Sequence, residues 1–242
     1  MKLALVQTLL ELRARKQPAA LVTELAGGAQ DVFTAGRPAA ALKLSASAQA
    51  AVQALVDADR SEETELDGRR CFVQVHNPVP RLIIVGAVHI SQALAPMAAT
   101  AGYAVTVVDP RRSFATNERF PGVTLSGDWP DEAMEKLQPD VRTAVVTLTH
   151  DPKLDDPALS AALRSPAFYI GALGSQKTHG ARVSRLTRAG FTEAEIARIH
   201  GPAGLDIGAK TPAEIAVSVL AQLTAARRGR RSQRAPQPAK AG

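Results

Sequence analysis

From Arg81 onward the sequence alternates regularly between short apolar runs and helical segments. Each run is almost continuously apolar and is bounded by glycine, proline or polar residues, which is typical of a strand buried on both faces of a sheet. Strands that alternate with helices form parallel sheets covered on both sides. The sequence therefore predicts an α/β, Rossmann-like parallel sheet. Its strands are expected at residues 82–85, 103–108, 123–125, 144–148 and 167–170.

Helices are predicted between these strands from apolar periodicity and capping residues. Thr211, Pro212 and Glu214 form a capping box with proline in the first turn, which marks the start of the last helix. Asp156 and Pro157 predict a similar start for the helix after the fourth strand. The expected helices cover residues 90–101, 132–137, 157–163, 177–188, 192–199 and the segment from 211 onward.

Residues 1–78 carry a different pattern, which predicts a small α+β domain. It contains helical segments at residues 1–15 and 45–57 and two pairs of strands. The dipeptide Asp67-Gly68 favours a two-residue hairpin turn within the second pair. A proline-containing break at residues 77–80 then separates this pattern from the next. We place the boundary there and predict an N-terminal domain (1–78), a Rossmann-like domain (79–228) and a basic tail (229–242).

The formal net charge of +6 is concentrated at the C-terminus. The chain has no acidic residue after Ala226, and the tail is rich in Pro, Gln, Ser and Ala, which cannot build a core. We therefore expect residues 229–242 to be a disordered, solubilising tail; contact with an acidic partner is the alternative. Because aromatic residues make up only 4% of the chain and the body is neutral, nucleic-acid binding is not expected. The basic residues that account for the excess are Arg227, Arg228, Arg230, Arg231, Arg234 and Lys240.

Composition also limits the setting in which the protein works. No apolar run approaches the ~20 residues needed to cross a bilayer, so no membrane association is expected. The chain has one cysteine, Cys71, which excludes an internal disulfide and favours a cytoplasmic protein. Because Cys71 lies in a predicted strand, we interpret it as a packing residue.

The candidate site lies at the ends of the predicted strands, because ligands of such sheets bind beyond their carboxyl ends. Gly86 follows the first strand and occupies the first position of a dinucleotide fingerprint. Val88 and Ser91 occupy the other two glycine positions, so the fingerprint is degenerate. Asp109 ends the second strand, where a ribose-binding acid is expected. Arg111 can bind a phosphate there or form a salt bridge within its own loop.

Two histidines follow strands that are neighbours in the usual order of this fold. His89 comes after the first strand and His150 after the fourth, so we expect both to face one crevice. Their imidazoles can transfer protons, bind a metal or hydrogen-bond to a cofactor. Metal binding is the weakest of these, because the sequence has no close histidine pair or cysteine cluster. Capping or packing is the alternative role for each histidine.

Two glycine-rich loops further along the chain are the strongest candidates. The loop after the fifth strand, with candidate residues Gly171, Gly174, Ser175 and Lys177, opens a helix as a phosphate-binding turn does, although without the Walker spacing. A tight turn with Ser175 as a helix cap is the alternative. The second loop, residues 201–211, has three glycines and a proline before the capped helix. These residues fix an unusual backbone conformation, which favours a functional role for the loop. Its candidate residues are Gly204, Asp206 and Gly208.

Together these loops resemble the XdhC/CoxI family, the accessory proteins of molybdenum hydroxylases. The resemblance covers about residues 70–228 and implies a Rossmann-like domain that binds molybdenum cofactor (molybdopterin). It also implies that the protein protects the cofactor during sulfuration and delivers it to a xanthine dehydrogenase-type hydroxylase. The implied partners are the apo-hydroxylase and a cysteine desulfurase, and a homodimer is a further expectation. The segments that carry the resemblance are residues 81–89, 107–111, 118–121, 169–178 and 201–218.

The N-terminal half departs from the family pattern. Typical members begin with a glycine-rich domain that contains Gly-Ser-x-Pro-Arg and Gly-Gly-Cys-Val-Glu stretches, and residues 1–78 contain neither. The chain therefore looks like a short variant with a divergent N-terminal half. Two alternatives stay open, an NAD(P)-dependent oxidoreductase that uses the same crevice and a regulatory module that senses a nucleotide. The oxidoreductase is weakened by Val88 and Ser91 in the fingerprint, whereas a carrier needs no turnover and therefore no nucleophile.

Overall fold

The structure is a computed structural model that describes residues 3–37, 39 and 41–229. Contacts divide the chain between Pro78 and Val79 into two compact units. Apart from Gly229, the predicted basic tail lies outside the described residues. None of the helices in the described ranges has the length and hydropathy needed to cross a bilayer.

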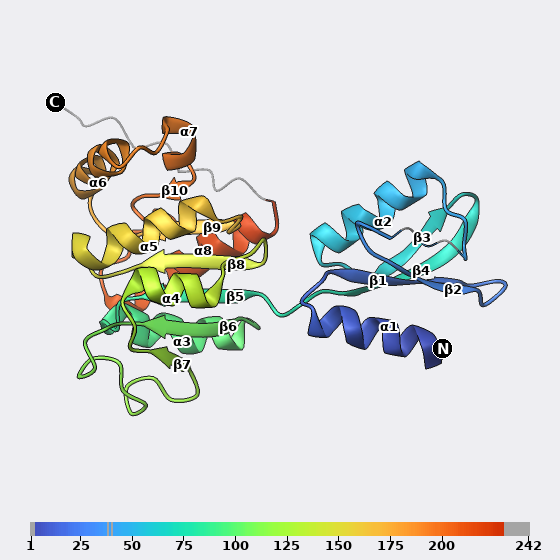
Figure 1. The fold of residues 1–242 in the computed structure, drawn as a ribbon, viewed down its shortest axis with the longest axis horizontal. Helices are drawn as coiled ribbons and strands as arrows, with labels where there is room; N and C mark the ends of the chain where they lie inside the picture. Colours follow the sequence, from blue (N-terminus) through green and yellow to red (C-terminus); the bar gives the residue numbers. More distant parts are fainter. Residues whose placement is uncertain (1–2, 38, 40, 230–242) are drawn as a thin grey trace. The chain divides into compact units, whose positions relative to one another are not determined.

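The N-terminal unit is an antiparallel sheet with one helix on each face (Figure 1). Its elements are α1 (Leu3–Ala14), β1 (Ala19–Glu24), β2 (Gln30–Phe33), α2 (Ala46–Ala58), β3 (Glu62–Leu66) and β4 (Arg69–His76). The strand order is β2-β1-β4-β3. In β1, Ala20 and Val22 pack in the cluster that includes α2, whereas Leu21 packs with residues of α1. Cys71 is buried in the α2 cluster, as a packing residue would be.

The C-terminal unit is a parallel six-stranded sheet between layers of helices (Figure 1). Its elements are β5 (Arg81–Val85), α3 (His89–Thr100), β6 (Ala104–Val108), β7 (Thr124–Ser126), α4 (Pro130–Leu137), β8 (Thr143–Thr147), α5 (Pro152–Arg164), β9 (Tyr169–Ala172), α6 (Gln176–Arg188), α7 (Glu193–Ile196), β10 (Ile199–His200) and α8 (Pro212–Arg227). The strand order is β7-β6-β5-β8-β9-β10. Numbered within the unit this is 3-2-1-4-5-6, the order of dinucleotide-binding folds, so the predicted Rossmann-like sheet is confirmed.

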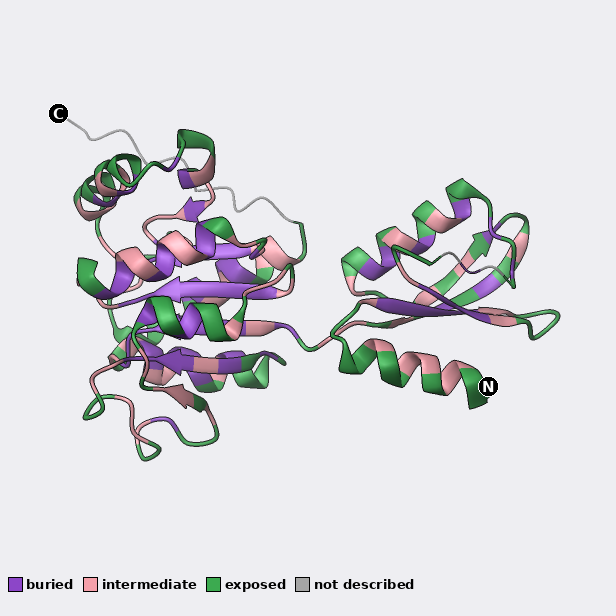
Figure 2. Cartoon of the chain, viewed as in Figure 1, coloured by how far each residue is buried: buried purple, intermediate pink, exposed green. Residues whose placement is uncertain are grey.

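Burial on both faces explains the continuous apolar runs of the central strands. In β5, Leu82 and Ile84 pack in the cluster that contains residues of α3 and α8. Ile83 and Val85 point the other way, into the cluster that contains residues of α4, α5 and α6. Figure 2 shows the central strands as buried, with exposed residues on the outer faces of the helices. The two helical layers therefore exclude water from the sheet, and the loops at its carboxyl edge follow directly from these buried strands.

The predicted start of α5 was wrong by five residues. The helix begins at Pro152 and is capped by Asp151, whose Oδ1 accepts a hydrogen bond from the Lys153 amide at 2.9 Å. Pro157 lies inside the helix instead of at its first turn. The sequence Asp-Pro occurs twice here, and the earlier pair starts the helix because Leu154 is buried in the additional turn.

The predicted helix at residues 192–199 was also wrong at its C-terminal end. The helix α7 ends at Ile196, and Ile199 and His200 form the short parallel strand β10 beside β9. A strand this short leaves no periodic signal in the sequence, and pairing with the sheet edge determines its conformation.

Candidate functional site

The carboxyl edge of the parallel sheet brings together most of the predicted site residues. Strand β5 pairs with β8, so the expected adjacency of the first and fourth strands is confirmed. His89 and His150 follow these two strands, and both are exposed. His150 adopts a φ of +62°, which reflects the tight turn between β8 and α5. A direct role for either imidazole in ligand binding stays a prediction.

The turn after β5 satisfies its own backbone donors. The Ala87 amide donates to Asp109 Oδ2 at 2.8 Å, and the Val88 amide donates to Ser91 Oγ at 2.7 Å. The Ser91 hydroxyl in turn donates to the Gly86 carbonyl at 2.6 Å. A dinucleotide-binding turn presents such amides to a pyrophosphate. Because these donors are used internally, the turn is poorly suited to bind a pyrophosphate in this conformation.

Asp109 is fully buried and acts as a brace between two loops. Besides Ala87, its carboxylate accepts hydrogen bonds from the Arg111 amide, Nε and Nη2 at 2.7–2.9 Å. Burial by itself raises the pKa of Asp109, but the hydrogen bonds from Arg111 and Ala87 outweigh it and hold the pKa below its ordinary value. Of the two roles expected for Arg111, the structure shows the salt bridge within its own loop, to Asp109. Contacts of Asp109 or Arg111 with a ligand stay a prediction.

The two glycine-rich loops meet at one cavity of about 320 Å³. The loop between β9 and α6 contributes Leu173 and Gly174 to its wall, and the loop before α8 contributes residues 202–209. A smaller cavity of about 240 Å³ adjoins it. Both cavities are lined by Pro202, Gly204, Leu205 and Asp206. Of the predicted site residues, Gly174, Gly204, Asp206 and Gly208 line the larger cavity.

Side chains of β9 and α8 hold the loop before α8 in place. Gln222 Oε1 accepts hydrogen bonds from the Tyr169 hydroxyl at 2.7 Å and from the Gly204 amide at 2.8 Å. The His200 ring stacks on Tyr169 with centroids 4.8 Å apart. Burial lowers the pKa of His200, so its imidazole is neutral near pH 7. The wall of the cavity is thus fixed by a neutral, hydrogen-bonded cluster.

Ser175 caps the start of α6, which the sequence left open as the alternative to a phosphate-binding turn. Ser175 Oγ accepts a hydrogen bond from the Thr178 amide at 3.2 Å, and Ser175 and Lys177 are exposed. Gly171 is buried within β9, and a Cβ at this position would lie 2.8 Å from the Tyr169 ring. Gly171 therefore serves packing, whereas Ser175 and Lys177 remain accessible to a ligand.

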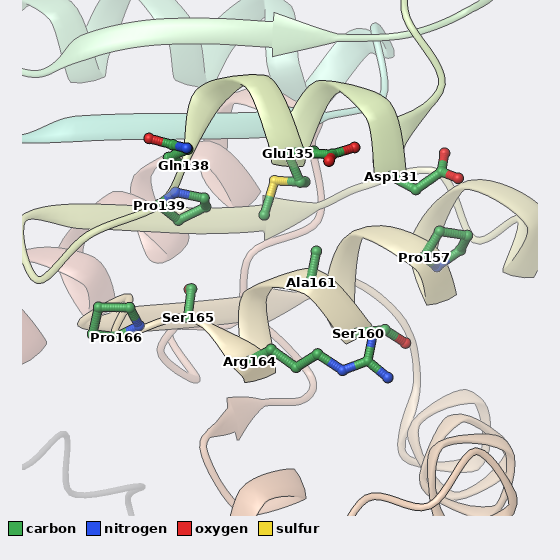
Figure 3. Close-up of a pocket in the computed structure, with 11 residues that line it drawn as sticks. Asp131, Glu135, Gln138, Pro139, Pro157, Ser160, Ala161, Arg164, Ser165 and Pro166 are labelled. Atoms are coloured by element: carbon green, nitrogen blue, oxygen red, sulfur yellow. The ribbon is translucent and has the colours of Figure 1, made fainter.

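A further cavity, of about 650 Å³, lies between α4 and α5 and contains none of the predicted site residues. Figure 3 shows Asp131 and Glu135 of α4 across it from Ala161 and Arg164 of α5. The sequence carries no signal for this cavity, because it arises from the spacing of two packed helices. In the parts of the chain that the structure describes, no group of three or more His, Cys, Asp or Glu side chains could hold a metal ion.

Comparisons with known proteins find relatives that match somewhat under two thirds of this chain. The molybdenum cofactor insertion chaperone PaoD of Escherichia coli is 34% identical over 150 residues, which cover 62% of this chain and 41% of that protein. A protein of Bacillus subtilis described as a probable xanthine dehydrogenase component is 34% identical over 158 residues, 65% of this chain and 46% of that protein. The protein YqeB of Escherichia coli is 36% identical over 154 residues, 63% of this chain and 28% of that protein. The matched segments thus span less than half of each relative.

The fold of the whole chain also has a solved counterpart. A crystal structure described as a xanthine dehydrogenase from Bacillus halodurans superposes with a TM-score of 0.65 at 24% identity, covering 96% of this chain and 66% of that one. At this identity the likeness concerns the fold alone. The sequence model described as the XdhC Rossmann domain matches residues 82–223. The resemblance inferred from the loops is therefore confirmed, and the chain belongs to the XdhC family.

Proposed function

We propose that this protein binds molybdenum cofactor at the carboxyl edge of its parallel sheet and assists insertion of the cofactor into a xanthine dehydrogenase-type hydroxylase. The observation that carries the proposal is the meeting of Gly174, Gly204, Asp206 and Gly208 at one cavity. The 34% identity to a chaperone named for molybdenum cofactor insertion supports the choice of cofactor. A cysteine desulfurase that supplies sulfur to the held cofactor is the further partner in this proposal.

The residues at the cavity fit the chemistry of a molybdopterin. The cavity's volume of about 320 Å³ lies at the lower end of the range for small-molecule sites. The exposed carboxylate of Asp206 can accept hydrogen bonds from the N–H groups of a pterin ring. The terminal phosphate suits the N-terminus of α6, where the helix dipole and the exposed Lys177 both favour an anion. When bound, the cofactor supplies the molybdenum and the sulfur ligands that the target hydroxylase needs.

In this proposal the chain's own residues hold and release the cofactor. The loop before α8 is fixed by Gln222, so its backbone is preorganised for binding. Asp206 and Lys177, by contrast, are exposed side chains whose contacts can be exchanged for those of a partner. This combination of a fixed wall and exposed polar side chains suits a carrier that passes its ligand on.

The proposal predicts that Asp206→Ala and Lys177→Ala weaken cofactor binding about tenfold without unfolding the protein, because each removes a charge-assisted hydrogen bond. The probe is molybdenum cofactor released from a purified molybdoenzyme, followed by the fluorescence of its oxidised pterin. Asp131→Ala and Lys136→Ala are matched controls, because both residues are exposed and lie on α4. Equal affinity of Asp206→Ala and the parent rejects the site, and tight binding of NAD(P)H without any pterin rejects the cofactor.

A transfer experiment tests the partners. The loaded protein, mixed with a purified apo-hydroxylase, is expected to restore hydroxylase activity, and added cysteine desulfurase with cysteine is expected to increase the restored fraction. Restoration at the same rate by free cofactor alone would contradict the insertion role.

A further inference from the structure

Arg182 on α6 is a buried cation with incomplete pairing. Its side chain is 1% exposed, and its Nη2 donates to the Leu173 carbonyl at 2.8 Å. The same nitrogen lies 3.7 Å from Asp155 Oδ2, and within the described residues Nε and Nη1 are buried without a hydrogen-bond partner. Buried charges are normally fully paired because desolvation is costly, so this arrangement calls for an explanation.

The contacts of Arg182 continue from loop to loop across the carboxyl edge. Leu173 lies in the wall of the 320 Å³ cavity. Asp155 Oδ1 accepts hydrogen bonds from the Thr149 hydroxyl at 2.6 Å and from the Thr149 amide at 3.4 Å. The methyl group of Thr149 packs so closely on Gly86 that a Cβ there would lie 2.4 Å from it. The loops after β9, β8 and β5 are thereby joined in one line.

A neighbouring ion pair already joins α5 to α6. Arg185 donates from both Nε and Nη2 to Asp156, and this pair links the same two helices. The Arg185–Asp156 pair is bidentate and partly exposed, which is the geometry of a strong Arg–carboxylate ion pair. The Arg182 guanidinium instead lies closer to the Leu173 carbonyl than to the Asp155 carboxylate. Burial raises the pKa of Asp155 and lowers that of Arg182, which indicates that desolvation outweighs their mutual attraction.

We propose that Arg182 is a positioning residue that couples the cavity-lining loop after β9 to the loops after β8 and β5. Through Leu173 on one side and Asp155 and Thr149 on the other, it holds the loops of the carboxyl edge in a single arrangement. Its effect on cofactor binding rests on the proposed function, whereas the coupling of the loops rests on the contacts described above and not on the proposed function.

Amide hydrogen exchange tests the coupling. The double variant Arg182→Gln/Asp155→Asn removes both charges and leaves no lone buried ion. We expect about tenfold faster exchange at the amides of both Leu173 and Thr149, with the central amides of β5 and β8 unchanged. Arg185→Gln is the matched control and is expected to leave both loops unchanged. Faster exchange only at Thr149, or the same effect from Arg185→Gln, would overturn the proposal.

Two further variants keep the test decisive. Arg182→Lys keeps the charge but not the guanidinium fork, and is expected to remain folded while exchange at Leu173 and Thr149 rises together. If the double variant does not fold, Thr149→Val removes the hydroxyl that binds Asp155 and is expected to raise exchange at Leu173. No rise at Leu173 in either variant would also overturn the proposal.

The cofactor probe separates this proposal from the one on function. If the parent binds the released molybdenum cofactor, Arg182→Lys is expected to bind it about tenfold more weakly. If the parent binds no pterin, the proposed function fails while the exchange measurements still decide the coupling. Faster exchange at both loops, with parental pterin affinity in every variant, would reject only the effect of Arg182 on cofactor binding.

Discussion

At the scale of single residues, the glycines of the cavity loop differ in what requires them. Gly204 has a φ of +100°, and a Cβ there would lie 2.3 Å from Ser218 Oγ. Gly208 has a φ of +74°, but a Cβ there would meet no described atom within 4 Å. Backbone conformation thus requires glycine at both positions, and close packing against α8 requires it at Gly204 alone.

This difference predicts unequal costs for two otherwise similar substitutions. Gly204→Ala is expected to lower the free energy of unfolding by about 2–5 kcal/mol, because a positive φ costs roughly 1–2 kcal/mol and overpacking adds roughly 1–3 kcal/mol. Gly208→Ala is expected to cost about 1–2 kcal/mol from the positive φ alone. Urea denaturation followed by circular dichroism measures both. Equal losses would show that Ser218 moves aside freely.

At the scale of elements, the start of α5 shows how packing chooses between two local signals. Asp151-Pro152 and Asp156-Pro157 are equally good cap-and-proline pairs. The earlier pair adds a first turn that buries Leu154 and Asp155, so the longer helix removes more surface from water. Asp156 is left to pair with Arg185 on α6.

The two aspartates are therefore expected to respond differently to removal of the carboxylate. Asp151→Ala is expected to destabilise the C-terminal unit by about 1 kcal/mol, because it removes the helix cap. Asp156→Ala is expected to cost about 0.2–1 kcal/mol, as for a partly exposed ion pair. Thermal unfolding of the two variants side by side checks the order. A larger loss for Asp156→Ala would mean that the helix effectively begins at Pro157.

At the scale of the whole molecule, each unit carries hydrophobic clusters of its own. Two clusters lie entirely between Leu82 and Ala226, and two lie entirely between Leu5 and Val75. The family match is confined to residues 82–223, and the proposed site also lies in this part. Folding and binding of the C-terminal unit are thus expected to be independent of residues 1–78.

A fragment of residues 79–229 tests this independence. Because it keeps both clusters and every residue of the proposed site, it is expected to unfold cooperatively and to bind molybdenum cofactor within about twofold of the full chain. Calorimetry and the pterin fluorescence titration are the measurements. A clear loss of affinity would place part of the site in the N-terminal unit or in residues 230–242.

Much of the fold was predictable because its determinants are local. Continuous apolar runs marked the parallel strands, and the capping box at Thr211 and Glu214 marked the start of α8, as the structure shows. The short strand β10 was missed because two residues carry no period. At the site, the two glycine-rich loops were recognised from composition. The burial of Asp109 was not, since its donors come from two separate turns.

Most of the elements, the class of sheet and the family could be inferred from the sequence, because hydrophobic periodicity, capping and loop motifs act over a few neighbouring residues. The pairing of the polar groups at the carboxyl edge depends instead on the tertiary fold. Ser91 and Asp109 satisfy the turn after β5, and Arg182 joins loops that lie far apart in the chain. Partners of this kind are selected by packing in three dimensions, where desolvation forces each buried polar group to take whichever partner the fold brings near.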